Sequence, residues 1–202
     1  MKNYNKIIIS GFLLILLSSC KEEIPVGGPI PLEITIDSTK IGDIVVDDSL
    51  GISFHPPLLW DSYDAESSKR SESKRTSRRQ MKEKYRLSPK HLFFDYSNNG
   101  ILNVSEIEII DSTISVDSTI SEYISLISRK YNPEDISFVN YSMDGLLIKH
   151  QTIKMKNLCS YKYVFTNLVG KLIQFDYSIR SKSEQTEFPK ILSSLGTIKL
   201  VK

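Results

Sequence analysis

The chain has 202 residues, 25% of them charged, and a formal net charge of +2 at pH 7. This length suffices for one domain with a sizeable core, and so small a net charge gives no overall basic character of the kind that nucleic-acid-binding domains have. The balance hides an asymmetry: residues 21–60 hold two basic and seven acidic residues, whereas residues 61–90 hold ten basic and five acidic ones.

The N-terminal residues have the pattern of a secretory signal. Lys2 and Lys6 precede an apolar run at residues 7–17. Its eleven residues are too few for a membrane-spanning helix, which needs about 20, but they fit the apolar region of a signal peptide, typically about 7–15 residues long. A buried core helix is the alternative, and the lack of a polar face argues against it. We therefore expect residues 1–19 to be a cleaved signal peptide.

The apolar run ends in Leu17, Ser18 and Ser19, which are followed by Cys20. This arrangement resembles the lipobox of bacterial lipoproteins, in which an aliphatic residue and two small residues precede a cysteine. The resemblance implies cleavage before Cys20, a diacyl lipid on its sulfur and stable anchoring in the outer membrane, because two or more acyl chains hold a protein firmly. Cys159 is then the remaining thiol, so no internal disulfide is expected.

The three residues after the anchor bear on which face of the membrane the protein occupies. Lys21 stands where an aspartate typically retains lipoproteins in the inner membrane. Lys21, Glu22 and Glu23 resemble the surface-export signal of one Gram-negative lineage, which implies display on the cell surface. An ordinary solvated charge cluster explains the same residues, so the face stays open.

A proline- and glycine-rich stretch follows the anchor. We expect residues 20–42 to be a lipid-anchored tether and residues 43–202 to be a single domain. Two short strands are expected around a turn at residues 48–51.

Residues 61–90 are rich in Ser, Lys and Arg and poor in aliphatic side chains, so we expect a basic, flexible insert. Three explanations of its charge stay open: a solvated loop without a partner, pairing with the acidic residues between 33 and 48, or contact with an external polyanion such as lipopolysaccharide or an anionic glycan. Nucleic acid is not expected, because no aromatic residues interleave with the charges. The residues that would contact a polyanion are Lys69, Arg70, Lys74, Arg75, Arg78, Arg79, Lys82, Lys84 and Arg86.

Beyond the insert, a hairpin and a helix are expected. Asn-Asn-Gly at residues 98–100 separates apolar runs at 92–96 and 101–110, and Asn-Gly is the strongest short hairpin signal. Thr119 and Glu122 form a capping-box pattern that predicts the start of a helix. The apolar stripe of this helix is Ile120, Ile124, Ile127 and Tyr131.

Regular alternation then predicts an antiparallel sheet with one buried face. Its strands are expected at 136–143, 146–153, 158–166 and 171–180. The buried positions include Cys159, Tyr161, Tyr163, Phe165, Ile173, Phe175, Tyr177 and Ile179, and the outward ones Gln174, Asp176, Ser178 and Arg180. A helix over 188–195 with Pro189 at its start, and an edge strand at 198–200, complete an α+β domain.

Two stretches suggest a family. "GISFHPPLLW" at 51–60 and "FPKILSSLGTIKL" at 188–200, together with the helix before the long meander, are similar to the PsbP-like superfamily over about 45–202. The resemblance implies an α/β sandwich, an antiparallel sheet flanked by helices, whose members mostly bind partners rather than catalyse reactions. The insert at 61–90 departs from that pattern, and no site residues carry over.

No motif for catalysis or cofactor binding is found. His55, His91 and His150 lack metal-ligand spacing, and Cys159 has no cysteine partner. Each histidine is better interpreted as structural or surface-exposed, and Cys159 as an inert core thiol. We therefore expect no enzymatic activity, no metal and no cofactor.

An Asp-Ser pair recurs four times. Such pairs supply turn and cap hydrogen bonds, but the pattern also resembles the O-glycosylation acceptor of exported proteins in that Gram-negative lineage. The candidate acceptors are Ser38, Ser49, Ser112 and Ser118.

The sequence therefore predicts a lipid-anchored, non-enzymatic binding or structural module of the outer membrane. The alternative is an accessory enzyme or small-ligand carrier with a site inside the sandwich. A polar pocket at His55 or His150 would favour that alternative, and a filled core with a charged face would favour the module.

Overall fold

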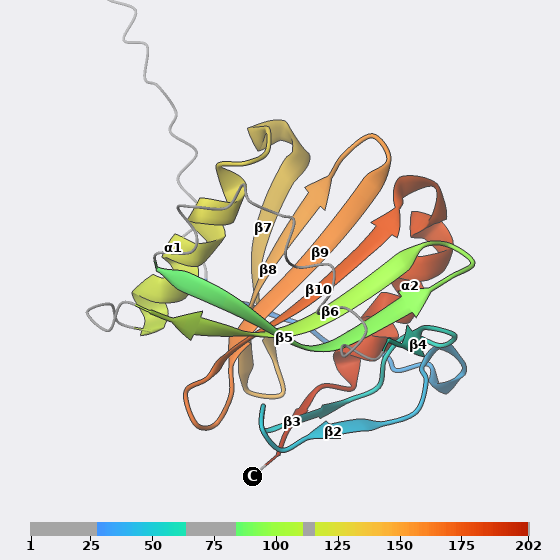
Figure 1. Ribbon diagram of the computed structural model, residues 1–202, viewed down its shortest axis with the longest axis horizontal. Coiled ribbons are helices and arrows are strands. Elements are labelled where there is room, and N and C mark those ends of the chain that lie inside the picture. Colours follow the sequence, from blue (N-terminus) through green and yellow to red (C-terminus); the bar gives the residue numbers. More distant parts are fainter. Residues whose placement is uncertain (1–27, 64–83, 111–115, 202) are drawn as a thin grey trace, which may run out of the picture.

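The computed structural model describes residues 28–63, 84–110 and 116–201, and the side chains of its first helix from Thr119 onward. A large sheet has the order β1-β7-β8-β9-β10-β6-β5-β4, and a small sheet has the order β11-β3-β2 (Figure 1). The strands of the large sheet are β1 (Ile30–Pro31), β4 (Asp61–Ser62), β5 (Tyr85–Asp95), β6 (Gly100–Ile109), β7 (Ile136–Met143), β8 (Leu146–Lys154), β9 (Leu158–Thr166) and β10 (Leu172–Arg180). The small sheet consists of β2 (Val45–Asp47), β3 (Ile52–Phe54) and β11 (Lys199–Leu200).

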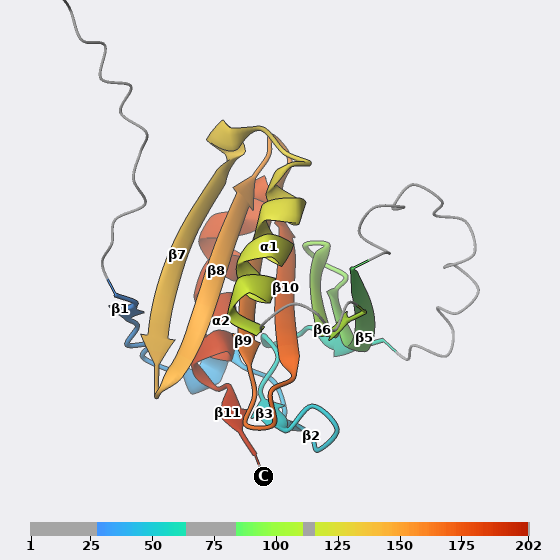
Figure 2. The same ribbon diagram turned by 90° about the vertical axis from the view of Figure 1, so that its left-hand side faces the viewer.

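The helices lie on opposite faces of the large sheet (Figure 2). Helix α1 (Val116–Ser128) packs on one face, and α2 (Glu184–Gly196) packs on the other together with the small sheet. In the described part of the chain, 3-10 turns join elements at η1 (Ser38–Lys40), η4 (Pro133–Asp135) and η5 (Ser181–Ser183). The predicted α+β class, a mainly antiparallel sheet flanked by helices, is confirmed.

Tight turns set the registers of the meander. Asp144 and Gly145 have φ angles of 49° and 80°, the left-handed pair that a two-residue hairpin turn requires, and Met143 pairs with Leu146 across them. The predicted β5–β6 hairpin has a longer loop, residues 96–99, in which Asn99 has a left-handed φ of 55° and across which Asp95 pairs with Gly100.

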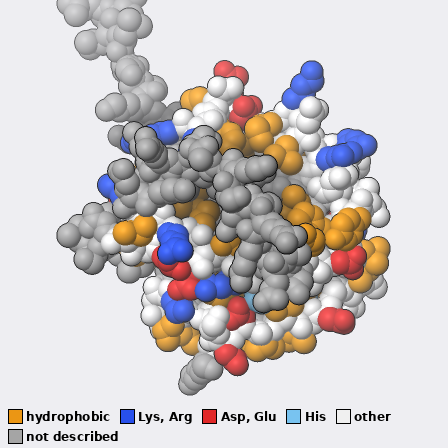
Figure 3. All heavy atoms as spheres, viewed as in Figure 1, with side chains coloured by type: hydrophobic (Ala, Val, Ile, Leu, Met, Phe, Trp, Pro, Cys, Tyr) orange, Lys and Arg blue, Asp and Glu red, His pale blue; other side chains and the backbone are white. Residues whose placement is uncertain are grey.

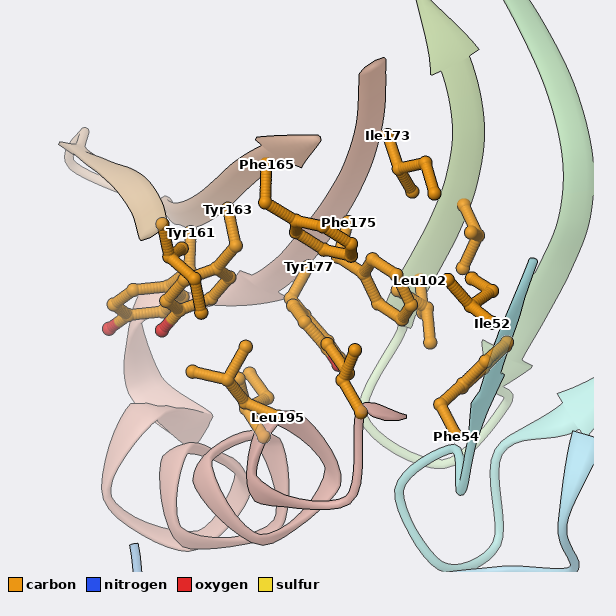
Figure 4. Packing of buried hydrophobic residues seen from close by; sticks show 14 of the residues in the cluster. Ile52, Phe54, Leu102, Tyr161, Tyr163, Phe165, Ile173, Phe175, Tyr177 and Leu195 are labelled. Carbon is orange, nitrogen blue, oxygen red and sulfur yellow. The ribbon is translucent and has the colours of Figure 1, made fainter. Parts of the chain in front are cut away.

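The main core lies between the large sheet, the small sheet and α2. Its inward-facing rings come from the strand positions predicted by the alternation, and Tyr161, Tyr163, Phe165, Phe175 and Tyr177 are all at most 2% exposed. Figure 4 shows how these side chains fill the space above α2. The predicted core face of β9 and β10 is confirmed.

The second face of the sheet is also buried in part, which corrects the prediction of a single buried face. The stripe of α1 covers Leu172, Val164 and Ile153. Gln174, predicted to face outward, is 2% exposed because its Oε1 accepts the hydroxyl hydrogen of Tyr123 from α1 at 2.7 Å.

Both helices begin earlier than predicted. Helix α1 starts at Val116, so Thr119 lies inside it, fully buried, and its predicted cap role is wrong. Helix α2 starts at Glu184 and contains Pro189 rather than beginning there. Acidic residues in the first turn, Glu184 and Glu187, favour this start through the helix dipole.

The predicted tether and insert are both shorter in the structure. Ile30–Pro31 pairs in parallel with β7, and Leu32 and Ile34 pack against the main core, so the domain begins well before residue 43. Both ends of the insert predicted at 61–90 belong to strands, because residues 61–62 form β4 and residues 85–90 are part of β5. Of the predicted insert, only residues 64–83 lie outside the described part of the chain.

Candidate functional site

A cluster of basic residues forms where two separate segments meet at one end of the large sheet. The turn between β8 and β9 contributes Lys156 and Asn157, and the end of β10 with η5 contributes Arg180, Ser181 and Lys182. We call these five residues the basic corner. The antiparallel register of β9 and β10 opposes residue 158 to residue 180 and so brings the two segments together.

Two hydrogen bonds made by Ser181 fix this arrangement. The Ser181 N–H donates to the Asn157 carbonyl at 3.2 Å, and the Ser181 hydroxyl donates to the Met155 carbonyl at 3.0 Å. These contacts hold the β8–β9 turn against the start of η5, so the cations project from a braced backbone rather than from a free loop.

The basic corner lines a hollow of about 380 Å³ in which all the charged side chains are positive. Lys156, Arg180 and Lys182 are exposed, and none of the three makes an ion pair with a described residue. Figure 3 shows Lys and Arg side chains gathered at the upper right, over the β8–β9 turn and the start of α2. Like charges that converge without partners create a positive potential that attracts anions.

A carboxylate that follows the basic corner in sequence is already engaged. Glu184, the first residue of α2, accepts from Lys154 Nζ at 2.6 Å and from the Tyr161 hydroxyl, and Cys159 Sγ lies 3.5 Å away. The hydrogen bond from Lys154 lowers the pKa of Glu184, with a smaller contribution from Tyr161. Burial, followed by the bond to Glu184, raises the pKa of Tyr161. Glu184 therefore stays ionised and paired with Lys154, and leaves the basic corner positive.

A second hollow of about 460 Å³ adjoins the first and shares Ser181 and Lys182 with it. Glu184, Gln185 and Phe188 also line it. The Phe188 ring lies 4.8 Å from the Tyr161 ring, centroid to centroid. The arginine of the basic corner is well matched to a phosphate or a carboxylate. The neighbouring Gln185 amide and Phe188 ring offer contacts to a polar group, such as a sugar, that carries this anion.

The sequence-predicted site residues are not part of the basic corner. Of the nine basic residues proposed for a polyanion contact, the structure describes two: Lys84, which pairs with Glu122 at 2.6 Å, and Arg86, which is 3.9 Å from Glu108 and 74% exposed. The other seven, Lys69, Arg70, Lys74, Arg75, Arg78, Arg79 and Lys82, lie outside the described residues, as do Cys20, Lys21, Glu22 and Glu23.

The Asp-Ser pairs have structural roles where they can be seen. Asp37 caps η1 by accepting from the Thr39 N–H at 3.0 Å, and the Ser49 hydroxyl donates to Asp47 at 2.6 Å. Ser38 and Ser49 are exposed. Ser112 and the side chain of Ser118 lie outside the described part of the chain.

The histidines have structural contacts. His55 Nδ1 lies 2.8 Å from the Gly42 carbonyl, and His91 Nε2 lies 2.7 Å from Asp47 Oδ2. His150 is 8% exposed and stacks on Tyr163 with ring centroids 4.4 Å apart, and burial lowers its pKa to about 4.

A hollow of about 550 Å³ lies at the opposite end of the sheet, around the β7–β8 and β9–β10 turns, and neither His55 nor His150 lines it. No group of three or more metal-ligating side chains occurs among the described residues. In the same part of the chain, no helix is both long enough and apolar enough to cross a membrane.

Comparisons with known proteins show a similarity in structure. No protein-family model matches the chain, and no curated protein matches it. The solution structure of cyanobacterial PsbP (CyanoP) from Synechocystis sp. PCC 6803 is similar to this chain, with 16% sequence identity and a TM-score of 0.48, over 87% of this chain and 99% of that one.

Proposed function

We propose that this chain is a non-enzymatic binding module, tethered to the outer membrane through a lipid on Cys20, and that its basic corner holds an anionic ligand. The observation that carries the proposal is the hollow lined by three cations without ion-pair partners among the described residues. The ligand chemistry that fits is a phosphate or carboxylate on a saccharide or a lipid headgroup.

The packing of the main core supports a surface site rather than a site inside the sandwich. Aromatic side chains from both sheets interlock there, with the Phe54 and Phe175 rings 4.9 Å apart. The exposed cations of the basic corner, in contrast, are held by a braced backbone and stay available to a ligand.

Vesicle binding tests the proposal with the full chain carrying Cys20→Ala, so that the lipid does not contribute. The probe is co-sedimentation with phosphatidylglycerol vesicles, with phosphatidylcholine vesicles as the neutral reference. Each basic residue near an anionic surface contributes about 1 kcal/mol, so replacing Lys156, Arg180 and Lys182 by alanine should weaken binding by roughly 100-fold. Lys199→Ala, at an exposed lysine on β11, is the matched control and should change binding little.

A second titration separates a lipid source from a soluble one. Inorganic phosphate should shift the backbone amide resonances of Asn157 and Ser181 in the Cys20→Ala chain, and the shifts should weaken steeply with salt. Phosphate shifts without vesicle binding would assign the site to a soluble anion. Binding that is insensitive to salt, or equal in the triple variant and the control, would refute the proposal.

The anchor and the export signal have their own tests. Cys20→Ala in cells should leave a longer precursor that takes up no labelled palmitate. Alanine at Lys21, Glu22 and Glu23 should hide a surface-exposed protein from external protease. Normal processing of the first variant, or unchanged accessibility of the second, would contradict the anchor and the export reading respectively.

The contribution of the basic insert is tested by changing charges rather than by deletion. Residues from 85 onward belong to β5, so a deletion through 86 would damage the sheet. Replacing the seven basic residues between 69 and 82 by serine leaves β5 intact. If the insert is a solvated loop without a partner, this variant should bind anionic vesicles as the parent does.

A further inference from the structure

The end of the large sheet opposite the basic corner exposes a group of large apolar side chains. Leu147 is the second residue of β8 and is 64% exposed, while Leu168 and Val169 lie in the β9–β10 turn and are 59% and 76% exposed. Ile30 of β1 is 57% exposed. Single exposed apolar side chains are common on protein surfaces, but a group of them indicates a contact site. We call these four residues the apolar end.

The strand registers explain why these residues lie at the same end. Lys149 of β8 is opposite Val164 of β9, so the start of β8 adjoins the end of β9. Strand β1 joins them because Ile30 pairs with Tyr141, close to the end of β7. Figure 1 and Figure 2 both show the β7–β8 and β9–β10 turns at the lower end of the sheet, away from the β8–β9 turn. The apolar end is therefore one surface made from three segments of the chain.

The hollow of about 550 Å³ at this end has a largely apolar wall. Its apolar lining includes Leu146, Leu147, Ile148, Leu168 and Leu200. Two polar side chains of the wall already have partners within the chain. Lys149 Nζ donates to the Ser121 hydroxyl at 2.6 Å, and Asn167 Nδ2 donates to the Leu50 carbonyl at 2.7 Å. This end therefore suits contact with an apolar surface better than the capture of a polar molecule.

The point at which the chain enters the domain indicates what that apolar surface is. Gly28 is the first residue that the structure describes, and Pro29 lines the hollow. Cys20, the anchor of the proposed function, precedes Gly28 by eight residues. Eight residues cannot span more than about 29 Å. A membrane that holds a lipid on Cys20 therefore lies within this reach of Gly28, and so of the apolar end beside it.

The charges around the apolar end limit how deep such a contact can go. Asp144 in the β7–β8 turn is exposed, and a carboxylate is costly inside the hydrocarbon layer. Lys171, which follows the β9–β10 turn, has a side chain that is 38% exposed. Such side chains fit the headgroup layer, with apolar neighbours at its boundary with the acyl chains. We propose that the apolar end rests in the interface of the membrane that holds Cys20.

An apolar end on the membrane, which rests on the lipid anchor of the proposed function, narrows the ligand of the basic corner. Strand β9 runs from the basic corner to the apolar end, and its nine residues span about 30 Å at roughly 3.3 Å each. This is several times the Debye length of about 8 Å at physiological salt. The cations would then lie beyond the field of the headgroups. The ligand that fits is an anionic saccharide that reaches away from the membrane, rather than a headgroup of the anchoring bilayer.

Fluorescence of the anchored chain tests this orientation. The full lipidated chain with Cys159→Ser carries one nitrobenzoxadiazole label, at Leu147→Cys or at Leu168→Cys, and is reconstituted into neutral phosphatidylcholine vesicles. The emission of both labels should shift to shorter wavelength and should be quenched by doxyl-labelled lipid. Tyr96→Cys is the matched control, because Tyr96 is 69% exposed and the β6–β10 register places its turn at the end of the basic corner. The emission of this control label should stay as in water.

The outcomes separate this proposal from the proposed function. Vesicle-bound chain whose labels at Leu147→Cys and Leu168→Cys stay in water, or behave as the label at Tyr96→Cys does, would overturn the orientation and leave the anchor standing. Absence of the chain from the vesicle fraction would overturn both. A shift that grows with the ratio of protein to lipid would also overturn the orientation, and would assign the apolar end to a second copy of the chain. Neutral vesicles offer the basic corner no anionic headgroup, so the result does not depend on anion binding.

Discussion

Phe175 is the residue at which the packing account can be tested most directly. Its side chain is fully buried, and its ring lies 4.9 Å from Phe54 of the small sheet and 5.9 Å from Phe165 of the neighbouring strand. It therefore joins the two sheets. Truncating a buried phenylalanine to alanine costs about 3–5 kcal/mol. Edge-to-face pairs add about 0.5–1.5 kcal/mol beyond burial, so we expect Phe175→Ala to lie near the upper end.

The next residue gives the contrast. Asp176 accepts hydrogen bonds from Lys162 Nζ and from the Ser160 hydroxyl, and its side chain is 20% exposed. Asp176→Ala leaves these donors without their acceptor and should cost about 1–3 kcal/mol, more than an ordinary surface change but less than Phe175→Ala. Asp176→Asn, which keeps an acceptor, should cost less than Asp176→Ala.

Urea unfolding followed by tryptophan fluorescence measures both costs, in a Cys20→Ala background. Trp60 is the single tryptophan of the chain, and it lies in the same core, with its ring 6.2 Å from that of Tyr177. Domains of this kind have a free energy of unfolding of about 5–15 kcal/mol, so both variants should retain a measurable transition. If Asp176→Ala costs as much as Phe175→Ala, the assignment of faces on β10 is wrong.

Three other changes probe separate parts of the fold. Gly100→Ala should cost about 1–3 kcal/mol in urea unfolding, because a Cβ there meets Trp60 at 2.6 Å, and Trp60→Phe should relieve part of that cost. Burial lowers the pKa of His150 to about 4, whereas its pKa in the unfolded chain is about 6.5. The unfolded chain therefore takes up the proton first, and the free energy of unfolding falls as pH drops from about 6.5 to about 4. His150→Phe should flatten the dependence of stability on pH between these values. Burial by itself would raise the pKa of Asp47, but hydrogen bonds, led by the one from Ser49, outweigh burial and lower the pKa. Ionised Asp47 therefore stabilises the folded chain above about pH 4, and this stabilisation is lost below that pH. Asp47→Asn should remove this acid-dependent loss of stability, and an unchanged loss of stability in acid would contradict the prediction.

The sequence could predict those parts of the fold in which local pattern and tertiary packing agree. Strict alternation in β9 and β10 identified the core rings, and Asn-Gly identified the β5–β6 hairpin, because each signal depends on neighbouring residues alone. Gln174 was assigned to the wrong environment for the opposite reason. Its polarity indicates solvent, but Tyr123 supplies a buried hydrogen-bond partner from a helix 51 residues away in sequence.

The start of β5 was missed because its composition is that of the basic insert. Arg86, Pro89 and Lys90 give no strand pattern, yet this half of β5 pairs with β6 up to a register shift between Pro89 and His91 and needs no partner on its outer side. Charge and proline, which argue against a central strand, are compatible with an edge.

The basic corner could have been found only by combining two weak signals. No acidic residue occurs at 154–161 or at 177–183, and the β9–β10 alternation places these stretches at the same end of one hairpin. The longer run of cations between 69 and 86 is the stronger signal in the sequence. Density of charge along the chain is a poor guide to density in space once strands fold back on themselves.

The small sheet has a consequence for when the chain can fold. Strand β3 pairs on one side with β2, its neighbour in sequence, and on the other with β11, so that Ile52 lies opposite Leu200 and the Val201 N–H donates to the Gly51 carbonyl at 3.0 Å. The main core also requires Ile191 and Leu195 from α2. A nascent chain therefore cannot complete its main core until residues 199–201 have been synthesised.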